Sequence, residues 1–288
     1  MTLRIIVITL LIICIGALII TQKKYLTERF VNNIPKVAVI ALVRRPVDFS
    51  LWLSKLREIG ISHFFLRIED TPSLEEFLKT QKDISFKMGA SSTGNNYESL
   101  QQRQVEFVNK SIKAAEELNI KWVFHIDSDE LLEGSLTFLD SLEPKFKCVK
   151  MENVEAVYSE TEESCFSSKK FVKCKEIGAK CRSYVNGKSG ARVESGVALA
   201  GPHDFSYNGA VNNQTITYIV PFEKLHVLHY DSCTFGSWAE KFSHLSKENA
   251  TSTPFKYYNE SIEQTQTAFA TYKKHTMNAD KSHIYTTA

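Results

Sequence analysis

The sequence predicts an α/β protein built around one mixed, mostly parallel β-sheet flanked by helices. Short apolar runs typical of buried strands alternate with helix-like segments through the first half of the chain. Such alternation implies parallel strands joined by right-handed crossovers. The 288 residues, 43% of them hydrophobic, are enough to bury the core of one large domain. We therefore predict a single domain over residues 36–248.

The first predicted strand is Lys36–Leu42, a continuous apolar run of the kind that is covered on both faces. A helix is expected next, because Pro46 and Asp48 are suited to its start and Gly60 to its C-terminal cap. A second strand follows at His63–Ile68. This part of the chain therefore opens as a strand, a helix and a strand.

A short helix is predicted to open at Thr71–Pro72, followed by a third strand at Ile84–Met88. The longest predicted helix carries one apolar stripe, formed by Leu100, Val105, Val108, Ile112, Ala115 and Leu118. The next strand, Lys121–Ile126, runs directly into the acidic segment Asp127–Glu130. Ligands of such sheets bind beyond the carboxyl ends of the strands, so we expect a site at this segment.

The second half of the chain has fewer regular patterns. Three further strands are expected at Phe146–Met151, Thr215–Val220 and Leu225–His229. Between them, Ser159–Ser189 is polar and contains cysteines, which indicates a large insertion. The tail, residues 249–288, has few regularly spaced apolar residues, so it is predicted to be a weakly packed helix or partly disordered.

The N-terminus predicts a membrane anchor. Ile5–Ile20 is almost wholly apolar, with Arg4 before it and a lysine pair after it, although it is shorter than the roughly 20 residues that span a bilayer. Without an Ala-x-Ala site after it, we predict an uncleaved signal anchor at residues 1–22 and a polar stem at residues 23–35. The large domain is then expected on the lumenal side (Golgi or ER), or otherwise extracytoplasmic. A cleaved signal or a buried element of the domain are the alternatives.

The cysteines and glycosylation sequons agree with such a compartment. Five cysteines lie outside the apolar segment: Cys148, Cys165, Cys174, Cys181 and Cys233. Disulfides are expected in an oxidising lumen, but their pairing cannot be read from the sequence, and no C-x-x-C spacing indicates a zinc site. Four N-x-Ser/Thr triplets begin at Asn109, Asn213, Asn249 and Asn259. The net charge is only +2, and the basic residues do not gather into a stripe. The sequence therefore shows no surface of the kind that binds nucleic acid.

The acidic segment is the main candidate for chemistry. Asp127 and Asp129 flank one residue after a hydrophobic strand, and an extended backbone would direct both carboxylates to the same side. Two such carboxylates suit a hard cation, Mn²⁺ or Mg²⁺, that keeps open positions for substrate phosphates. A solvated acidic turn, or a set of helix caps, is the structural alternative.

A resemblance to a known family is carried by Trp122–Leu132, WVFHIDSDELL. It is similar to the W-x-x-x-x-D-x-D-E-hydrophobic signature of GT-A fold glycosyltransferases related to families 2 and 92. Further blocks that resemble these enzymes are Leu53–Ile68, Asn186–Ser189 with Arg192, Gly201–His203, and His229–Ser232 with Trp238 and Lys241. Together they cover roughly Val37–Ser243.

The resemblance implies a GT-A, Rossmann-like fold and the transfer of a sugar from a nucleotide-diphosphate donor, first a UDP-sugar, to a glycan or glycoprotein acceptor. The metal would be held by Asp127, Asp129 and His229 and would stabilise the charge of the leaving diphosphate. The expected donor-binding residues are Arg44 (or Arg45), Glu69, Asp70, Asp127, Lys188, Arg192 and His203. An inverting reaction needs a general base, for which Asp204 is the first candidate and Glu194 the second, whereas a retaining reaction needs none.

Two other classes remain open from the sequence. An inactive lumenal carbohydrate-binding protein could keep the same fold, since fold does not fix function. A metal-dependent phosphohydrolase would also use clustered carboxylates. It would need further Asp and His ligands near the first strand, and Ala38–Leu42 supplies none.

Overall fold

The computed structural model describes residues 36–90, 97–157, 164–173, 184–247, 265–277 and 284–287. The predicted anchor (1–22) and stem (23–35) lie outside these ranges. Among the residues that are described, no helix has both the length and the apolar character needed to cross a membrane.

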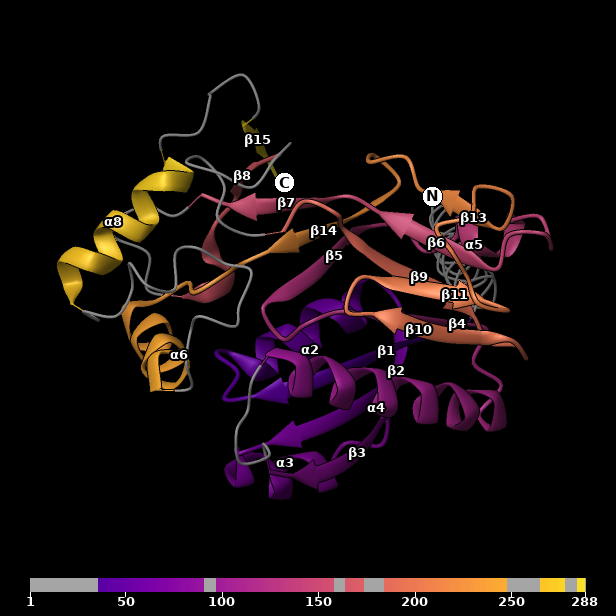
Figure 1. Ribbon diagram of the computed structural model, residues 1–288, viewed down its shortest axis with the longest axis horizontal. Coiled ribbons are helices and arrows are strands. Elements are labelled where there is room, and N and C mark those ends of the chain that lie inside the picture. The colour runs from indigo at the N-terminus through magenta and orange to yellow at the C-terminus, as the bar shows by residue number, and fades with distance from the viewer. Residues whose placement is uncertain are drawn as a thin grey trace, which may run out of the picture.

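The main element is a seven-stranded sheet in the order β13-β6-β9-β4-β1-β2-β3 (Figure 1). Its strands are β1 (Val37–Arg44), β2 (Ile61–Glu69), β3 (Ile84–Gly89), β4 (Trp122–His125), β6 (Cys148–Met151), β9 (Lys188–Arg192) and β13 (Thr217–Ile219). Neighbouring strands are parallel except where β9 pairs with β4 and β6. The prediction of a mixed, mostly parallel sheet is confirmed.

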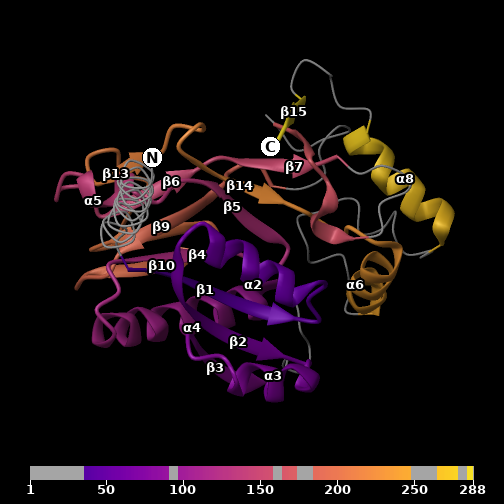
Figure 2. The ribbon, with the colours of Figure 1, turned by 180° about the vertical axis from the view of Figure 1, so that it is seen from behind.

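Helices cover both faces of this sheet. The side chains of β1 point alternately to the two faces, and each face has its own hydrophobic core. Val39 and Val43 pack in the core that contains Trp52 of α2 (Phe49–Glu58). Ile40 packs in the core that contains Val108 and Ile112 of α4 (Tyr97–Glu117). Helix α4 lies on the face toward the viewer in Figure 1 and α2 on the face toward the viewer in Figure 2. A strand buried on both faces needs the continuous apolar run that the sequence shows.

Two smaller sheets complete the fold. One has the order β15-β8-β7-β14-β5, and the other has the order β10-β11-β12. Their bounds are β5 (Glu130–Gly134), β7 (Asn153–Ala156), β8 (Lys170–Val172), β10 (Val197–Gly201), β11 (Asp204–Tyr207), β12 (Ala210–Val211), β14 (Leu225–His229) and β15 (Ile284–Thr286). The pairing of β14 with β5 is antiparallel and places His229 opposite Glu130. This pairing brings the end of β14 to the acidic segment.

The remaining helices are short, apart from two near the C-terminus. They are η1 (Pro72–Leu74), α3 (Glu75–Lys79), α5 (Phe138–Ser141), η2 (Cys165–Ser167), α6 (Phe235–Lys247) and α8 (Gln266–Met277). Helix α8, within the predicted tail, packs on α6 through Phe269 against Phe235 and Trp238. In the same tail, β15 pairs with β8. The described part of the tail therefore adds a helix and a strand to the domain.

Candidate functional site

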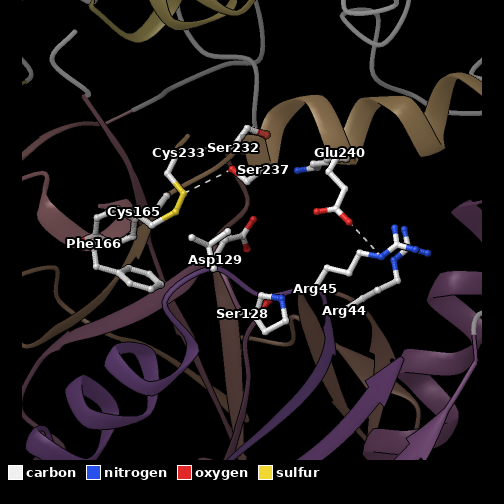
Figure 3. Close-up of a pocket in the computed structure, with 14 residues that line it drawn as sticks. Arg44, Arg45, Ser128, Asp129, Cys165, Phe166, Ser232, Cys233, Ser237 and Glu240 are labelled. Atoms are coloured by element: carbon white, nitrogen blue, oxygen red, sulfur yellow. Dashed lines mark hydrogen bonds and ion pairs between the residues drawn. A yellow bond between two sulfur atoms is a disulfide. The ribbon is translucent and has the colours of Figure 1, made fainter. Parts of the chain in front are cut away.

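A pocket lies where the strand order reverses. From β1 the chain proceeds to β2 and β3 on one side and returns to β4 on the other, so the carboxyl ends of β1 and β4 form a topological switch point. Arg44 at the end of β1 with residues 45–47 after it, and Ser128 with Asp129 after β4, line a cavity of about 210 Å³ (Figure 3). The segment from Tyr230 to Lys241, which enters α6, supplies the facing wall. This is the place where ligands of open α/β sheets bind.

A disulfide forms part of that wall. Cys165 of η2 bonds to Cys233, 68 residues later in the sequence, and both cysteines line the pocket (Figure 3). Asp48 holds the same segment, because its carboxylate accepts from the Cys165 backbone N–H at 3.2 Å. Cys148 is a buried free thiol in β6. The other two cysteines named above lie outside the described residues.

Three side chains form a cluster that could hold a metal ion, and one of them, Asp129, lines the pocket. One potential ligand atom from each of Asp129, His229 and Asp231 lies within 4.8 Å of the others. The Tyr230 N–H donates to the Asp129 carbonyl at 2.8 Å, so the backbones that carry the ligands are joined directly. Two carboxylates and an imidazole suit a divalent cation without selecting one metal. Asp231 is a member that the sequence analysis did not select.

A buried acid orients the histidine of this cluster. Glu155 Oε2 lies 2.7 Å from Nδ1 of His229, which leaves Nε2 facing Asp129 at 3.8 Å. A carboxylate on the second ring nitrogen is the usual support of a metal-binding histidine. Burial opposes protonation of His229, but Glu155 and Asp129 outweigh it and hold the pKa of the imidazole well above its usual value. A metal ion bound at Nε2 would therefore have to replace a proton of His229.

Asp127 lies apart from the cluster. The chain turns at Ser128 and Asp129, and the Glu130 N–H closes the turn on the Asp127 carbonyl at 3.1 Å. The extended backbone expected from the sequence is therefore absent here, and the two carboxylates do not point to the same side. Instead, the Asp127 carboxylate accepts from Lys188 Nζ at 2.5 Å and from Gln104 Nε2 at 3.2 Å.

Lys188 is the centre of a buried polar network. Its fully buried ammonium contacts Asp127 and lies 3.3 Å from Glu130, which also accepts from the Tyr184 hydroxyl. Burial alone would lower the pKa of Lys188, but Asp127 and Glu130 raise it above its usual value. Burial likewise opposes ionisation of Asp127, and Lys188 outweighs it and lowers the pKa of that carboxyl. Burial raises the pKa of Glu130 to about 7.

Two histidines near this network are neutral. Burial lowers the pKa of His203 to about 3, and its Nδ1 lies 2.9 Å from the Gly187 carbonyl. Burial lowers the pKa of His125 to about 4, and its Nδ1 lies 2.9 Å from the Ile40 carbonyl. The sequence selected His203 as a donor contact, but the structure places it against the network rather than on the pocket wall.

The wall opposite the cluster is basic. Arg44 and Arg45 both line the pocket, as expected for residues that contact a phosphate. Arg45 and Ser232 adopt left-handed backbone conformations (φ of 48° and 49°), which non-glycine residues rarely adopt and which concentrate at functional sites. Arg45 Nε lies 3.3 Å from Glu240 of α6, and Figure 3 marks this ion pair with a dashed line. Asp129 and these two guanidinium groups therefore line the same pocket, whereas His229 and Asp231 adjoin it without lining it.

Several residues selected from the sequence do not line the pocket. Glu69 is fully buried, and its carboxylate accepts from Arg67 at 2.6 Å and from Arg103 at 2.8 Å. These ion pairs occupy the carboxylate inside the fold. The next residue, Asp70, does not line the pocket either. Arg192 packs over the Trp122 ring at 4.6 Å and donates to a carbonyl at 2.8 Å. These contacts stabilise the sheet.

The two candidate bases are also held in ion pairs outside the pocket wall. Asp204 lies 2.5 Å from Lys150, and Glu194 lies 2.8 Å from Lys147. The structure therefore does not bring either of them to the metal-type cluster.

Comparison with known proteins supplies no assignment. No protein-family model matches the chain, and none of the curated proteins is significantly similar to it. The functional argument consequently depends on the site itself.

Proposed function

We propose that the protein is a metal-dependent glycosyltransferase of GT-A type, which transfers a sugar from a nucleotide-diphosphate donor, first a UDP-sugar, to a hydroxyl of a glycan or glycoprotein. The observation that carries this proposal is the cluster of Asp129, His229 and Asp231 beside a basic wall at the switch point of the sheet. A site for a divalent cation beside guanidinium groups suits a diphosphate, because both offset its negative charge.

The residues of the pocket and of the adjoining cluster have different roles in this proposal. Asp129, His229 and Asp231 would hold Mn²⁺ or Mg²⁺, which when bound offsets the negative charge that develops on the leaving diphosphate. Arg44 and Arg45 offer positive charge from the facing wall. Glu155 fixes the ring of His229 without contacting the donor. Inversion stays part of the proposal, but its base is not assigned to Asp204 or Glu194, because both are ion-paired elsewhere.

The disulfide supports the proposed compartment. A bond such as Cys165–Cys233 persists in an oxidising lumen and is rare in the cytosol. Lumenal placement of the domain, with membrane anchoring through residues 1–22, therefore remains our proposal for its localisation.

Binding of UDP tests the proposal. Isothermal titration of the full-length chain in mild detergent would compare UDP affinity with and without Mn²⁺, for the wild type, Asp129→Asn and a control, Asp140→Asn. Asp140 lies exposed on α5, outside the site. We expect binding that requires Mn²⁺, is lost in Asp129→Asn and is retained in the control. Binding of UDP that ignores both Mn²⁺ and Asp129 would refute the proposal.

The same samples separate an enzyme from an inactive binding protein. Incubation of the wild type with a panel of UDP-sugars should release UDP in the presence of Mn²⁺, since a transferase slowly hydrolyses its donor when acceptor is absent. Metal-dependent UDP binding without any release or transfer would favour the carbohydrate-binding alternative. GDP and CMP in the titration identify a different donor nucleotide.

A further inference from the structure

Helix α6 is attached to the pocket by two ion pairs that use groups of the ligand site. Lys241 Nζ lies 2.6 Å from Oδ1 of Asp231, a member of the metal-type cluster. The preceding residue, Glu240, pairs with Arg45 of the basic wall at 3.3 Å. Each pair thus joins one residue of α6 to a group that a metal ion or a diphosphate would also need.

Lys241 and a divalent cation compete for Asp231. The Asp231 carboxylate is buried, with only 9% of its side chain exposed, so solvent screens its surroundings little. An ion coordinated by Asp231 would lie within a few ångströms of the ammonium, and two cations at that separation repel strongly. Lys241, in contrast, has 39% of its side chain exposed and four rotatable bonds, so it can leave its partner and remain at the pocket, which it lines.

We propose that metal binding displaces Lys241 from Asp231, and that the released ammonium then binds the donor diphosphate. This inference rests on the proposed function and assigns Lys241 as a positioning and phosphate-binding residue of the same site. The second ion pair, Arg45–Glu240, is also exchanged: the guanidinium group of Arg45 leaves Glu240 and binds the diphosphate. Both exchanges replace a contact within the protein by a contact with the ligands, and both occur on consecutive residues of α6.

The exchange predicts that metal and nucleotide bind cooperatively. Metal alone must break the Lys241–Asp231 pair and leaves the ammonium without that carboxylate. A diphosphate supplies a new partner, so each ligand strengthens the binding of the other. Thermodynamic linkage requires the same factor in both directions.

Titration of Mn²⁺ into the full-length chain, with and without saturating UDP, tests this exchange. The variants are Lys241→Met, which removes the charge but keeps an aliphatic chain, and Lys55→Met, a control at an exposed position on α2. Without UDP, Lys241→Met should bind Mn²⁺ about fivefold or more tightly than the wild type. With UDP, the gain in Mn²⁺ affinity should be smaller in Lys241→Met than in the wild type, because the metal still meets the diphosphate but the released ammonium is missing. Lys55→Met should match the wild type throughout.

Other outcomes overturn the inference in distinguishable ways. If the wild type binds Mn²⁺ and UDP but Lys241→Met has unchanged or weaker Mn²⁺ affinity, the exchange is wrong while the proposed function stands. If the wild type binds no Mn²⁺, both fail. Lys241→Gln is a second variant in case the first does not fold, because glutamine keeps a hydrogen bond to Asp231 without the charge. It should show the same tighter Mn²⁺ binding.

Discussion

The buried ammonium of Lys188 lies 2.5 Å from the carboxylate of Asp127, and this contact gives the two aspartates of the D-x-D sequence different roles. Asp127 neutralises a lysine inside the fold, whereas Asp129 belongs to the cluster at the pocket. The same lysine lies 3.3 Å from Glu130, the residue after Asp129. Lys188 therefore stabilises the turn that directs Asp129 toward His229 and Asp231.

Replacement of Lys188 by methionine should destabilise the protein. The variant leaves the negative charge of Asp127 and the buried Glu130 without their cation, a change that typically costs about 3 kcal/mol or more. Urea unfolding of Lys188→Met beside Lys121→Met, an exposed control before β4, measures the difference. A loss below about 1 kcal/mol, the size expected of a surface pair, would contradict this role.

His125 should make the protein sensitive to acid. Its folded pKa is lowered by burial to about 4 from 6.5, so below pH 6.5 the unfolded chain binds more protons than the folded one. The stability that this neutral histidine contributes is present above pH 6.5 and is lost as pH falls through about 4. The loss is on the order of 3 kcal/mol, since each pKa unit corresponds to about 1.4 kcal/mol. His203, whose pKa is lowered by burial to about 3, also contributes stability that is lost as the pH falls through about 3.

The His125→Phe variant isolates this contribution. Urea unfolding of both proteins at pH 7 and pH 4.5, with a chelator present, should show a smaller acid loss in the variant than in the wild type. Equal losses would mean that His125 is not neutral in the folded protein.

Arg44 should serve the nucleotide and not the metal. It lines the basic wall but is not among the cluster residues, so Arg44→Gln should weaken UDP binding about tenfold, a loss of about 1.4 kcal/mol, and leave Mn²⁺ affinity unchanged. Titration with each ligand separately makes this comparison. A parallel loss of Mn²⁺ affinity would indicate that the variant disturbs the whole pocket.

The disulfide should support both stability and the site. It closes a separation of 68 residues, for which the chain-entropy model gives up to about 4 kcal/mol, and it fixes the segment just after Asp231. The double variant Cys165→Ser/Cys233→Ser should unfold at lower temperature and bind Mn²⁺ more weakly. Reductant should lower the unfolding temperature of the wild type more than that of the double variant. Identical responses to reductant would show that this bond contributes little.

The parallel part of the sheet could be predicted from the sequence. The predicted strands Lys36–Leu42, His63–Ile68 and Ile84–Met88 correspond to β1, β2 and β3 within two residues at each end. The continuous apolar run of β1, which is covered on both faces, is visible without knowledge of its partners. The edge strand β3 instead alternates apolar and polar residues. The short strands β10, β11 and β12 were not predicted, although β10 (Val197–Gly201) is a short apolar run.

The site could be predicted only in part. Asp129 and His229 were selected and do converge, while Asp231 was not, because the antiparallel pairing of β14 with β5 decides which residues meet. Lys188 was expected to contact the donor but is buried against Asp127. Whether a charged side chain faces a pocket or another charge depends on tertiary contacts, which a linear pattern does not contain.

The central claim is that a divalent cation binds to Asp129, His229 and Asp231. The most direct test is the anomalous scattering of manganese in crystals of the protein grown with Mn²⁺ and UDP. We predict a peak within coordination distance of all three side chains, with Lys188 still paired to Asp127 and Lys241 moved away from Asp231. A peak held by both Asp127 and Asp129, or no peak at this pocket, would contradict the claim.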